Sequence, residues 1–369
     1  MIFFPEFHAF AFQTQRLIAE IPGGGADVME IARAAERIEE GDFESWRSGW
    51  AWIADHVRGI AERNASEGHR TSAREGYFRA ANYYRSSEFF LPRDDPRKLE
   101  TWRSMVDCFE RGAELSEPPF EWFRSPYEEG EGLPGYLARP LGAEGPLPTV
   151  VYLNGADGTK EESWYLAGRA FVDRGVNFVA IDGPGQGEVL RVQEVYSRPD
   201  YEAAISPLYD LLAGRDDVDR DRMALVGISM GGYYAGRIAC YEHRFRAFAL
   251  HGACHSVLED LYEPYEPIRR QVQWFTGTFD DAGAREVLKG FDLGPHLDKV
   301  TRPTYICHGT EDVLVQPSAA EKTFAGITGA EKMLQWWGPE ETGSLHANVD
   351  NPSEAYPALA DWVVDHLRG

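Results

Sequence analysis

The chain has 369 residues, of which 43% are hydrophobic and 26% charged, so it can form a large core and lacks the composition of a disordered or fibrous protein. Its formal net charge of -23 would repel phosphate groups, which argues against nucleic acid and anionic membrane surfaces as partners. A chain of this length predicts one large domain with an appendage, because single cores stop growing at roughly 250–300 residues.

The cysteine pattern and the N-terminal residues predict a cytoplasmic protein. The four cysteines are scattered without the spacing of disulfide partners, which indicates reduced thiols: Cys108, Cys240, Cys254 and Cys307. The chain begins without the basic region and cleavage site of a signal peptide. Since no apolar run approaches the roughly 20 residues that span a bilayer, we also expect no membrane insertion.

The first third of the chain has a helical pattern. Apolar residues such as Ile31, Ala34 and Ile38 recur at three- and four-residue spacing, and this pattern continues to about residue 115. Glycine, proline and polar residues interrupt it and divide it into four or five helices. We therefore predict an N-terminal helical domain over residues 1–117.

A different pattern begins after Pro118. Short apolar runs alternate with helical segments, which predicts a mostly parallel, doubly wound sheet in a second domain over residues 118–369. The predicted strands are 135–139, 149–153, 177–181, 223–228, 247–250, 304–307 and 332–337. Acidic and aromatic residues replace the strand pattern over residues 256–300, which we interpret as an inserted lid.

Residues 227–231 match the motif G-x-S-x-G around Ser229. The motif follows a predicted strand and precedes a helical pattern, which is the context of a nucleophile elbow in an α/β-hydrolase. Glycines flank the serine because strand and helix approach closely at such a turn. We therefore predict that Ser229 is the catalytic nucleophile.

A serine nucleophile needs a base and an acid that orients the base. In this fold the acid comes next in the chain, and Asp312 follows a predicted strand within an H-G-x-x-D sequence, the usual form of this loop. Its neighbour Glu311 is the alternative acid. His346 follows the last predicted strand and is the expected base, whereas His366 lies in a terminal helical pattern and is expected at the surface.

An oxyanion intermediate needs fixed N–H donors. The backbone N–H of Met230, directly after the nucleophile, is the first expected donor. The second should come from the turn after the predicted strand 149–153, where Gly155 and Ala156 are both candidates. The sequence does not distinguish between these two residues.

Neither of two other motifs predicts a cofactor or metal. Residues 183–187 read G-x-G-x-G rather than the G-x-x-G ending of a dinucleotide-binding loop, so they are interpreted as a tight turn. His251 and His255 have no matching group of ligands elsewhere, so His251 is expected to line a pocket. We expect neither cofactor nor metal ion.

Taken together, the helical region, residues 158–163, residues 182–188 and the Ser229 motif resemble the α/β-hydrolase family of 2,6-dihydroxypseudooxynicotine hydrolase. That family has an N-terminal helical domain and includes polyketide-shortening hydrolases of fungal pigment pathways. The resemblance covers nearly the whole chain and implies the triad Ser229, Asp312 and His346. It makes carbon–carbon bond hydrolysis in a 1,3-dicarbonyl a candidate reaction, and it allows a homodimer formed through the helical domain.

The expected function is hydrolysis of a bulky aromatic or polyketide-like carbonyl compound. Cleavage of a carbon–carbon bond would need an acid from the lid or a substrate that delocalises the charge of the leaving group. Candidates for this acid are the lid carboxylates Glu259, Asp260, Glu263 and Glu266, and the lid residues expected at the substrate are Glu259, Tyr262 and Glu263. The alternatives are a carboxylesterase or thioesterase that acts on a bulky ester, and a non-hydrolytic cyclase or binding protein of the same fold.

Overall fold

The computed structural model describes residues 3–128, 130–156 and 158–368. The chain forms two compact units. Unit 1 comprises Met1–Phe120 together with Trp164–Leu166, and unit 2 comprises Glu121–Ser163 together with Ala167–Gly369. The domain division into residues 1–117 and 118–369 stays a prediction.

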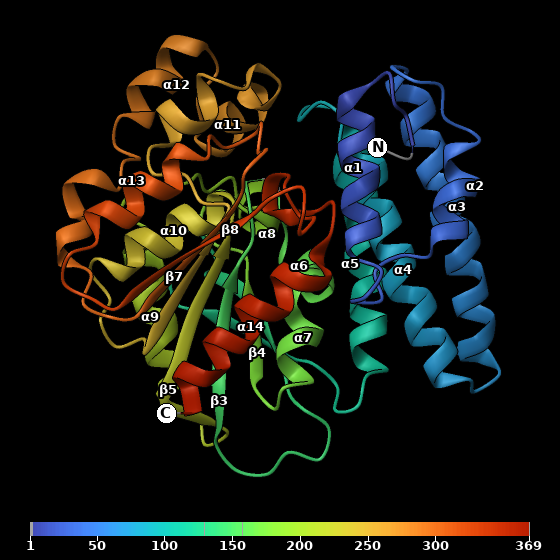
Figure 1. Ribbon diagram of the computed structural model, residues 1–369. Coiled ribbons are helices and arrows are strands. Elements are labelled where there is room, and N and C mark those ends of the chain that lie inside the picture. Colours follow the sequence, from blue (N-terminus) through green and yellow to red (C-terminus); the bar gives the residue numbers. More distant parts are fainter. Residues whose placement is uncertain (1–2, 129, 157, 369) are drawn as a thin grey trace. The chain divides into compact units, whose positions relative to one another are not determined.

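Unit 1 is helical. Its described helices are α1 (His8–Ala19), α2 (Val28–Ala35), α3 (Phe43–Ser66), α4 (Arg70–Glu88) and α5 (Pro96–Glu114), coloured blue to cyan in Figure 1. Asp27, Asp42 and Asp95 precede α2, α3 and α5, and each carboxylate accepts hydrogen bonds from N–H groups of the first turn. Such N–H groups have no partner inside the helix, so these side chains determine where each helix begins.

Aromatic side chains fill the interior of unit 1. Trp46 and Trp50 are fully buried on α3, with their ring centroids 5.5 Å apart, and the Trp46 indole donates to the Ser86 carbonyl on α4 at 2.7 Å. The segment Trp164–Leu166 belongs to the same unit, where the Tyr165 hydroxyl donates to the Phe78 carbonyl at 2.8 Å.

Unit 2 is built on an eight-stranded sheet within the described residues. The strands are β1 (Glu121–Ser125), β2 (Leu133–Ala138), β3 (Leu147–Leu153), β4 (Asn177–Ile181), β5 (Val218–Ile228), β6 (Ala247–His251), β7 (Thr304–Gly309) and β8 (Lys332–Trp337). Their order is β1-β2-β4-β3-β5-β6-β7-β8, with β2 antiparallel to β1 and β4 and the remaining neighbours parallel. The predicted mostly parallel, doubly wound sheet is therefore confirmed.

The edge strand β1 was not among the predicted strands. Glu121, Trp122 and Arg124 are exposed in it. Strands buried on both faces have nearly continuous apolar runs, but an edge strand can keep polar and charged side chains. The pattern that predicts the inner strands is therefore absent from β1.

The described helices of unit 2 cover both faces of the sheet. They include α6 (Lys160–Ser163), α7 (Arg169–Val172), α8 (Gly187–Arg191), α9 (Glu202–Ala213), α10 (Met230–Ala239), α13 (Ser318–Gly326) and α14 (Pro352–Arg368), with a π-helical turn η1 (Trp164–Gly168) between α6 and α7 and a short 3-10 turn η5 (His346–Asn348). α10 packs on β5 and beside α9, whereas α14 packs on β5 to β7 and beside α7. Figure 1 shows these two pairs on opposite sides of the strands.

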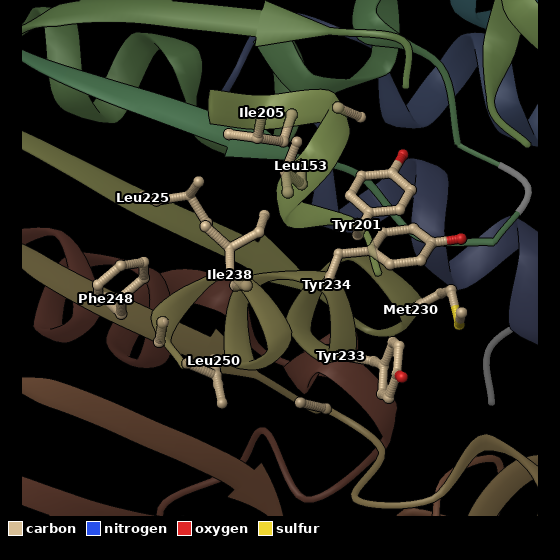
Figure 2. Close-up of a cluster of buried hydrophobic side chains, with 14 of the residues drawn as sticks. Leu153, Tyr201, Ile205, Leu225, Met230, Tyr233, Tyr234, Ile238, Phe248 and Leu250 are labelled. Atoms are coloured by element: carbon tan, nitrogen blue, oxygen red, sulfur yellow. The ribbon is translucent and has the colours of Figure 1, made fainter. Parts of the chain in front are cut away.

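The core beside β5 joins the sheet to α10. Figure 2 shows Leu225 of β5 facing Ile238 of α10, and both side chains are fully buried. The rings of Tyr201 and Tyr234 stack at a centroid distance of 3.6 Å, which ties the start of α9 to α10. Since α10 begins directly after Ser229, this packing holds the helix that follows the predicted nucleophile.

The predicted lid is a helical insertion between β6 and β7, defined here as residues 256–300. It contains η2 (Leu258–Tyr262), η3 (Glu266–Ile268), α11 (Arg269–Phe275), α12 (Asp281–Leu288) and η4 (Gly294–Lys299). The insertion contributes buried side chains to the core of unit 2, among them Leu261, Val272, Phe275 and Leu288. Its role as a lid stays a prediction.

In the part of the chain that the structure describes, no helix has both the length and the apolar character needed to cross a membrane.

Candidate active site

Ser229 occupies a sharp turn between β5 and α10. Its φ of 56° and ψ of -120° are unusual for a residue with a side chain, and such strain persists only where the surroundings enforce it. One constraint is the Ser229 N–H, which donates to the carbonyl of His251 on β6 at 2.7 Å.

Two glycines allow the close approach of backbones around this turn. A Cβ atom at Gly227 would lie 1.9 Å from the Gly231 carbonyl oxygen, and one at Gly231 would lie 2.1 Å from the Leu153 carbonyl oxygen. No side chain fits at either position. The turn between β5 and α10 and the turn after β3 are therefore packed backbone against backbone.

His346 links the predicted nucleophile to the predicted acid. Its Nε2 lies 2.9 Å from Ser229 Oγ, and its Nδ1 lies 2.6 Å from Asp312 Oδ2. The three residues follow β8, β5 and β7, whose carboxyl ends lie along one edge of the parallel sheet. When Nδ1 carries the ring proton and donates it to the carboxylate, Nε2 carries no proton and can accept the serine proton.

Asp312 is a buried carboxylate with donors on both oxygens. The N–H groups of Leu314 and Val315 donate to Oδ1 at 2.8 and 2.9 Å, and His308 Nε2 lies 3.0 Å from Oδ2, the oxygen that also binds His346. Burial alone would raise the pKa of Asp312, but the two imidazoles and their hydrogen bonds hold it well below its ordinary value. Asp312 therefore stays ionised beside His346.

Glu311, the alternative acid, makes a different contact. Its carboxylate accepts a hydrogen bond from the Ser344 hydroxyl at 2.9 Å, in the loop that precedes His346. His366, which was expected at the surface, lies on α14 with 21% of its side chain exposed, and its Nδ1 is 2.8 Å from the Trp362 carbonyl oxygen. The structure thus brings Asp312 and His346 to Ser229 and engages Glu311 elsewhere.

The loop that carries His346 is held from both sides. The Asp350 carboxylate accepts the N–H groups of Gly343, Ser344 and Leu345 at 2.8–3.0 Å. Beyond the histidine, Asn348 has a left-handed backbone, and its side-chain amide donates to the Gly343 carbonyl. These contacts close the loop into a compact turn around the imidazole.

His251 connects this loop to the serine turn. Its carbonyl accepts the Ser229 N–H, and its Nε2 lies 2.6 Å from Asn348 Oδ1. Burial lowers the pKa of His251 to about 4, so the ring is neutral near pH 7 and donates its Nε2 proton to the amide oxygen. His251 was expected to line a pocket, which stays a prediction. In the structure its carbonyl and its ring connect the Ser229 turn to the loop that carries His346.

Two of the predicted oxyanion donors, Met230 and Gly155, lie beside the serine. Met230 is the first residue of α10, where N–H groups have no partner within the helix. Gly155 lies so close that a Cβ atom there would be 3.4 Å from Ser229 Cβ. The Gly155 N–H itself donates to Asn154 Oδ1 at 2.7 Å.

The lid residues expected at the substrate make contacts within or near the insertion. Glu259 lies near Lys322, with 71% of its side chain exposed. The hydroxyl of buried Tyr262 donates to Asp281 at 2.6 Å. Glu263 binds Arg285 at 2.7 Å, and that hydrogen bond holds the pKa of Glu263 below its ordinary value. Their role at the substrate stays a prediction.

Among residues 3–128, 130–156 and 158–368, no group of three or more His, Cys, Asp or Glu side chains is placed to hold a metal ion.

Comparison with known proteins identifies the family to which this chain belongs. A model of the prolyl oligopeptidase family matches residues 165–369, and a model of FrsA-like esterases matches residues 43–265. The chain belongs to these α/β-hydrolases. The expected fold class and the assignment as a hydrolytic enzyme are thereby confirmed.

This hydrolase has relatives along nearly its whole length. The 20-hydroxy-prefusarin hydrolase FUS2 of Gibberella moniliformis is 30% identical over 96% of this chain and 95% of its own. Hydrolase LUC6 of a Fusarium species is 37% identical, with the same coverage. The crystal structure of 2,6-dihydroxy-pseudo-oxynicotine hydrolase superposes with a TM-score of 0.83 at 26% identity and covers 95% of both chains. The family resemblance expected from the sequence is therefore confirmed.

Three supporting residues of this hydrolase were missed by the sequence analysis: His308, Asn348 and Asp350. His308 belongs to the H-G-x-x-D sequence that pointed to Asp312, so that motif contained a signal for it. Asp350 acts within the loop that carries His346, and Asn348 also binds the distant His251, but both residue types are common in any surface turn. No spacing in the sequence distinguishes them.

The glycine packing predicts that Gly231→Ala disables this hydrolase. The added methyl group cannot be accommodated without moving the Leu153 carbonyl, so we expect at least a 100-fold loss of kcat and a loss of about 2–4 kcal/mol in the free energy of unfolding. Gly214→Ala is the control, because a Cβ atom there meets its neighbours at 3.6 Å and the φ of -83° suits any residue. Equal activity of both variants in an esterase assay would contradict this account.

His251 predicts a specific acid sensitivity of folding. In the unfolded chain this histidine takes up a proton below about pH 6.5, but in the folded chain it does so only below about pH 4. Between these values the unfolded chain binds more protons, so the free energy of unfolding falls by about 1.4 kcal/mol per pH unit as the pH is lowered from 6.5 to 4.

Urea unfolding of wild type and His251→Gln across this pH range measures the contribution of His251. Glutamine can still donate to Asn348 but does not titrate, so we expect a shallower pH dependence in the variant. His69→Gln removes a histidine whose side chain is 60% exposed and should leave the wild-type slope unchanged. Parallel slopes in His251→Gln and wild type would refute the prediction.

Proposed function

We propose that this hydrolase cleaves a bulky aromatic or polyketide-like carbonyl compound with Ser229 as nucleophile. The observation that carries the proposal is the continuous hydrogen-bonded chain from Ser229 Oγ through His346 to the ionised Asp312. In the first step Ser229 Oγ attacks the substrate carbonyl while His346 Nε2 takes the hydroxyl proton. The N–H of Met230 and a second donor at residues 155–156 stabilise the oxyanion.

Collapse of this intermediate releases the leaving group, and His346 returns the proton to it. Water, activated by the same histidine, then hydrolyses the acyl-enzyme and frees Ser229. An ester would release an alkoxide. A 1,3-dicarbonyl would release an enolate, so the scheme cleaves a carbon–carbon bond and adds one water across it.

The environment of the lid carboxylates favours a substrate that stabilises its own leaving group. Glu263 is held ionised by Arg285, so it has no proton to give, and Glu259 is exposed beside Lys322. An enolate spreads its charge onto a second oxygen and needs no such acid. We therefore propose a 1,3-dicarbonyl as the preferred substrate class, which agrees with the family resemblance.

Ester hydrolysis is the second candidate, because a model of FrsA-like esterases matches residues 43–265. Ser229, His346 and Asp312 would perform ester hydrolysis without an additional acid. Relatives named after 20-hydroxy-prefusarin and 2,6-dihydroxy-pseudo-oxynicotine support a small organic molecule as substrate.

We further propose that residues 118–369 form the catalytic domain and residues 1–117 a separate helical domain. A cytoplasmic location agrees with the four free, buried cysteines. A homodimer formed through the helical domain is proposed from the family resemblance alone.

Labelling with a fluorophosphonate tests the nucleophile. Wild type should react with the reagent, and Ser229→Ala should lose the label together with at least about 10⁴-fold in kcat, because the remaining groups supply only oxyanion and binding effects. The exposed Ser353→Ala is the control and should label like wild type. Labelling that persists in Ser229→Ala, or a folded wild type that does not react, would overturn the assignment.

Mass spectrometry of products from paired aryl 1,3-diketones and aryl esters tests the substrate class. We expect the diketone to yield an acid and a ketone, with one oxygen from isotopically labelled water in the acid. Glu263→Gln should change the kcat of this reaction by less than about threefold, since Glu263 donates no proton in our scheme. Loss of diketone cleavage with retained ester hydrolysis in Glu263→Gln would instead identify Glu263 as the required acid.

A further inference from the structure

The glycine-rich turn at residues 182–188 lies against the loop that follows β3. Its strand β4 pairs in parallel with β3, so the two turns emerge side by side at the same edge of the sheet. Gln186 extends from this turn and is 2% exposed. Its Nε2 donates to the carbonyl oxygens of Asn154 and Gly155 at 2.5 and 3.0 Å.

The orientation of the Gln186 amide is determined by its own partners. Its Oε1 accepts the Gly183 N–H at 3.3 Å and lies 3.1 Å from the hydroxyl of fully buried Tyr201. A flipped amide would place its NH₂ group against these two donors and its oxygen against two carbonyl oxygens. The NH₂ group therefore faces the loop after β3.

This contact and the turn hydrogen bond from the Gly158 N–H to the Gly155 carbonyl at 3.2 Å together set the direction of the peptide that joins Gly155 to Ala156. In a planar trans peptide the C=O and N–H groups point in opposite directions. Because the Gly155 carbonyl points to Gln186, the Ala156 N–H points away from Gln186. Gly155 itself adjoins Ser229, since a Cβ atom there would lie 3.8 Å from Ser229 Oγ.

The Gly155 N–H is already engaged by the side chain of Asn154. Asn154 Oδ1 accepts it at 2.7 Å, and the Asn154 Nδ2 donates to the Thr159 carbonyl and to the buried carboxylate of Glu162 at 3.0 and 3.1 Å. With both ends of its amide bonded, Asn154 holds the Gly155 N–H away from other acceptors. Of the two candidate donors, only Ala156 remains for an oxyanion.

We infer that Gln186 is a positioning residue that orients the Gly155–Ala156 peptide so that the Ala156 N–H is the second oxyanion donor. This inference rests on the proposed function, because an oxyanion forms only if Ser229 attacks a carbonyl. Gln186 touches no reacting atom and acts through the peptide that it orients. The turn at residues 182–188 thereby acquires a role in the reaction.

Buried charged groups hold the turn at residues 182–188 at a fixed distance from the segment that follows β3. Asp182 accepts the Lys160 N–H at 2.6 Å and lies 3.2 Å from Lys160 Nζ, which also binds Glu161 at 2.6 Å. Burial by itself lowers the pKa of Lys160, but the facing carboxylates of Asp182 and Glu161 raise it above its ordinary value, so the ammonium stays charged. A rigid support of this kind suits an oxyanion donor, whose benefit depends on being fixed before the reaction.

The test compares Gln186→Met with Gln193→Met. Methionine keeps the length of the side chain and removes its donors. Gln193 makes the same type of contact elsewhere, accepting the Glu131 N–H and donating to the Gly132 carbonyl at 2.9 and 3.0 Å. We expect Gln186→Met to lower kcat for p-nitrophenyl acetate by about 10- to 100-fold with KM changed less than twofold, and Gln193→Met to leave both constants within twofold.

Two further measurements distinguish a misoriented oxyanion donor from a general disturbance of the fold. Binding of a trifluoromethyl ketone, which mimics the oxyanion, should weaken by the same factor as kcat, and the pH profile of kcat should keep its shape because the titrating groups are unchanged. Tyr201→Phe removes only the hydroxyl beside Gln186 Oε1, so the fold should persist while kcat falls about 3- to 10-fold.

Wild-type kcat in Gln186→Met and Tyr201→Phe, losses confined to KM, or an equal loss in Gln193→Met would overturn the inference. Labelling with the fluorophosphonate distinguishes a failure of this inference from a failure of the proposed function. A wild type that fails to label at Ser229 refutes the function itself. Normal labelling with unchanged turnover in the Gln186 variant refutes only the role of Gln186.

Discussion

The active site depends on three backbone segments that meet more closely than any side chain allows. At Gly227 and Gly231, β5 and α10 pack against each other and against the turn after β3, with carbonyl oxygens where Cβ atoms would be. This contact forces Ser229 into its strained conformation and brings Gly155 beside it. The proposed nucleophile and the proposed oxyanion donors are thus parts of one rigid contact, and displacement of any one segment would separate them.

Carboxylates with several donors secure the surrounding loops. Asp312 binds two imidazoles and two N–H groups, and Asp350 binds three N–H groups of the histidine loop. Asp260 binds the N–H groups of His255 and Ser256 and thereby holds the start of the insertion. Asp312 and Asp260 are buried, which would be costly for an isolated charge, but hydrogen bonds from fixed donors replace the lost water.

Two sets of strands divide the proposed catalytic work. The carboxyl ends of β5, β7 and β8 carry Ser229, Asp312 and His346, which in our proposal move a proton. The ends of β3 and β4 carry the loops of Asn154 and Gln186, which in our inference orient the Ala156 N–H toward the oxyanion. Because both sets project from the same edge of one sheet, hydrogen bonding between strands fixes their spacing.

The sequence by itself determined the sheet, the nucleophile motif and the order of Ser229, Asp312 and His346, since apolar strand patterns and short motifs are local signals. It did not reveal β1, whose exposed edge lacks the apolar pattern, nor the choice between Gly155 and Ala156. The tertiary structure alone brought Gln186, Asn348 and His251 to the loops that they brace. Their contacts join residues from distant parts of the chain, and a hydrogen bond between distant loops leaves no periodicity in the sequence.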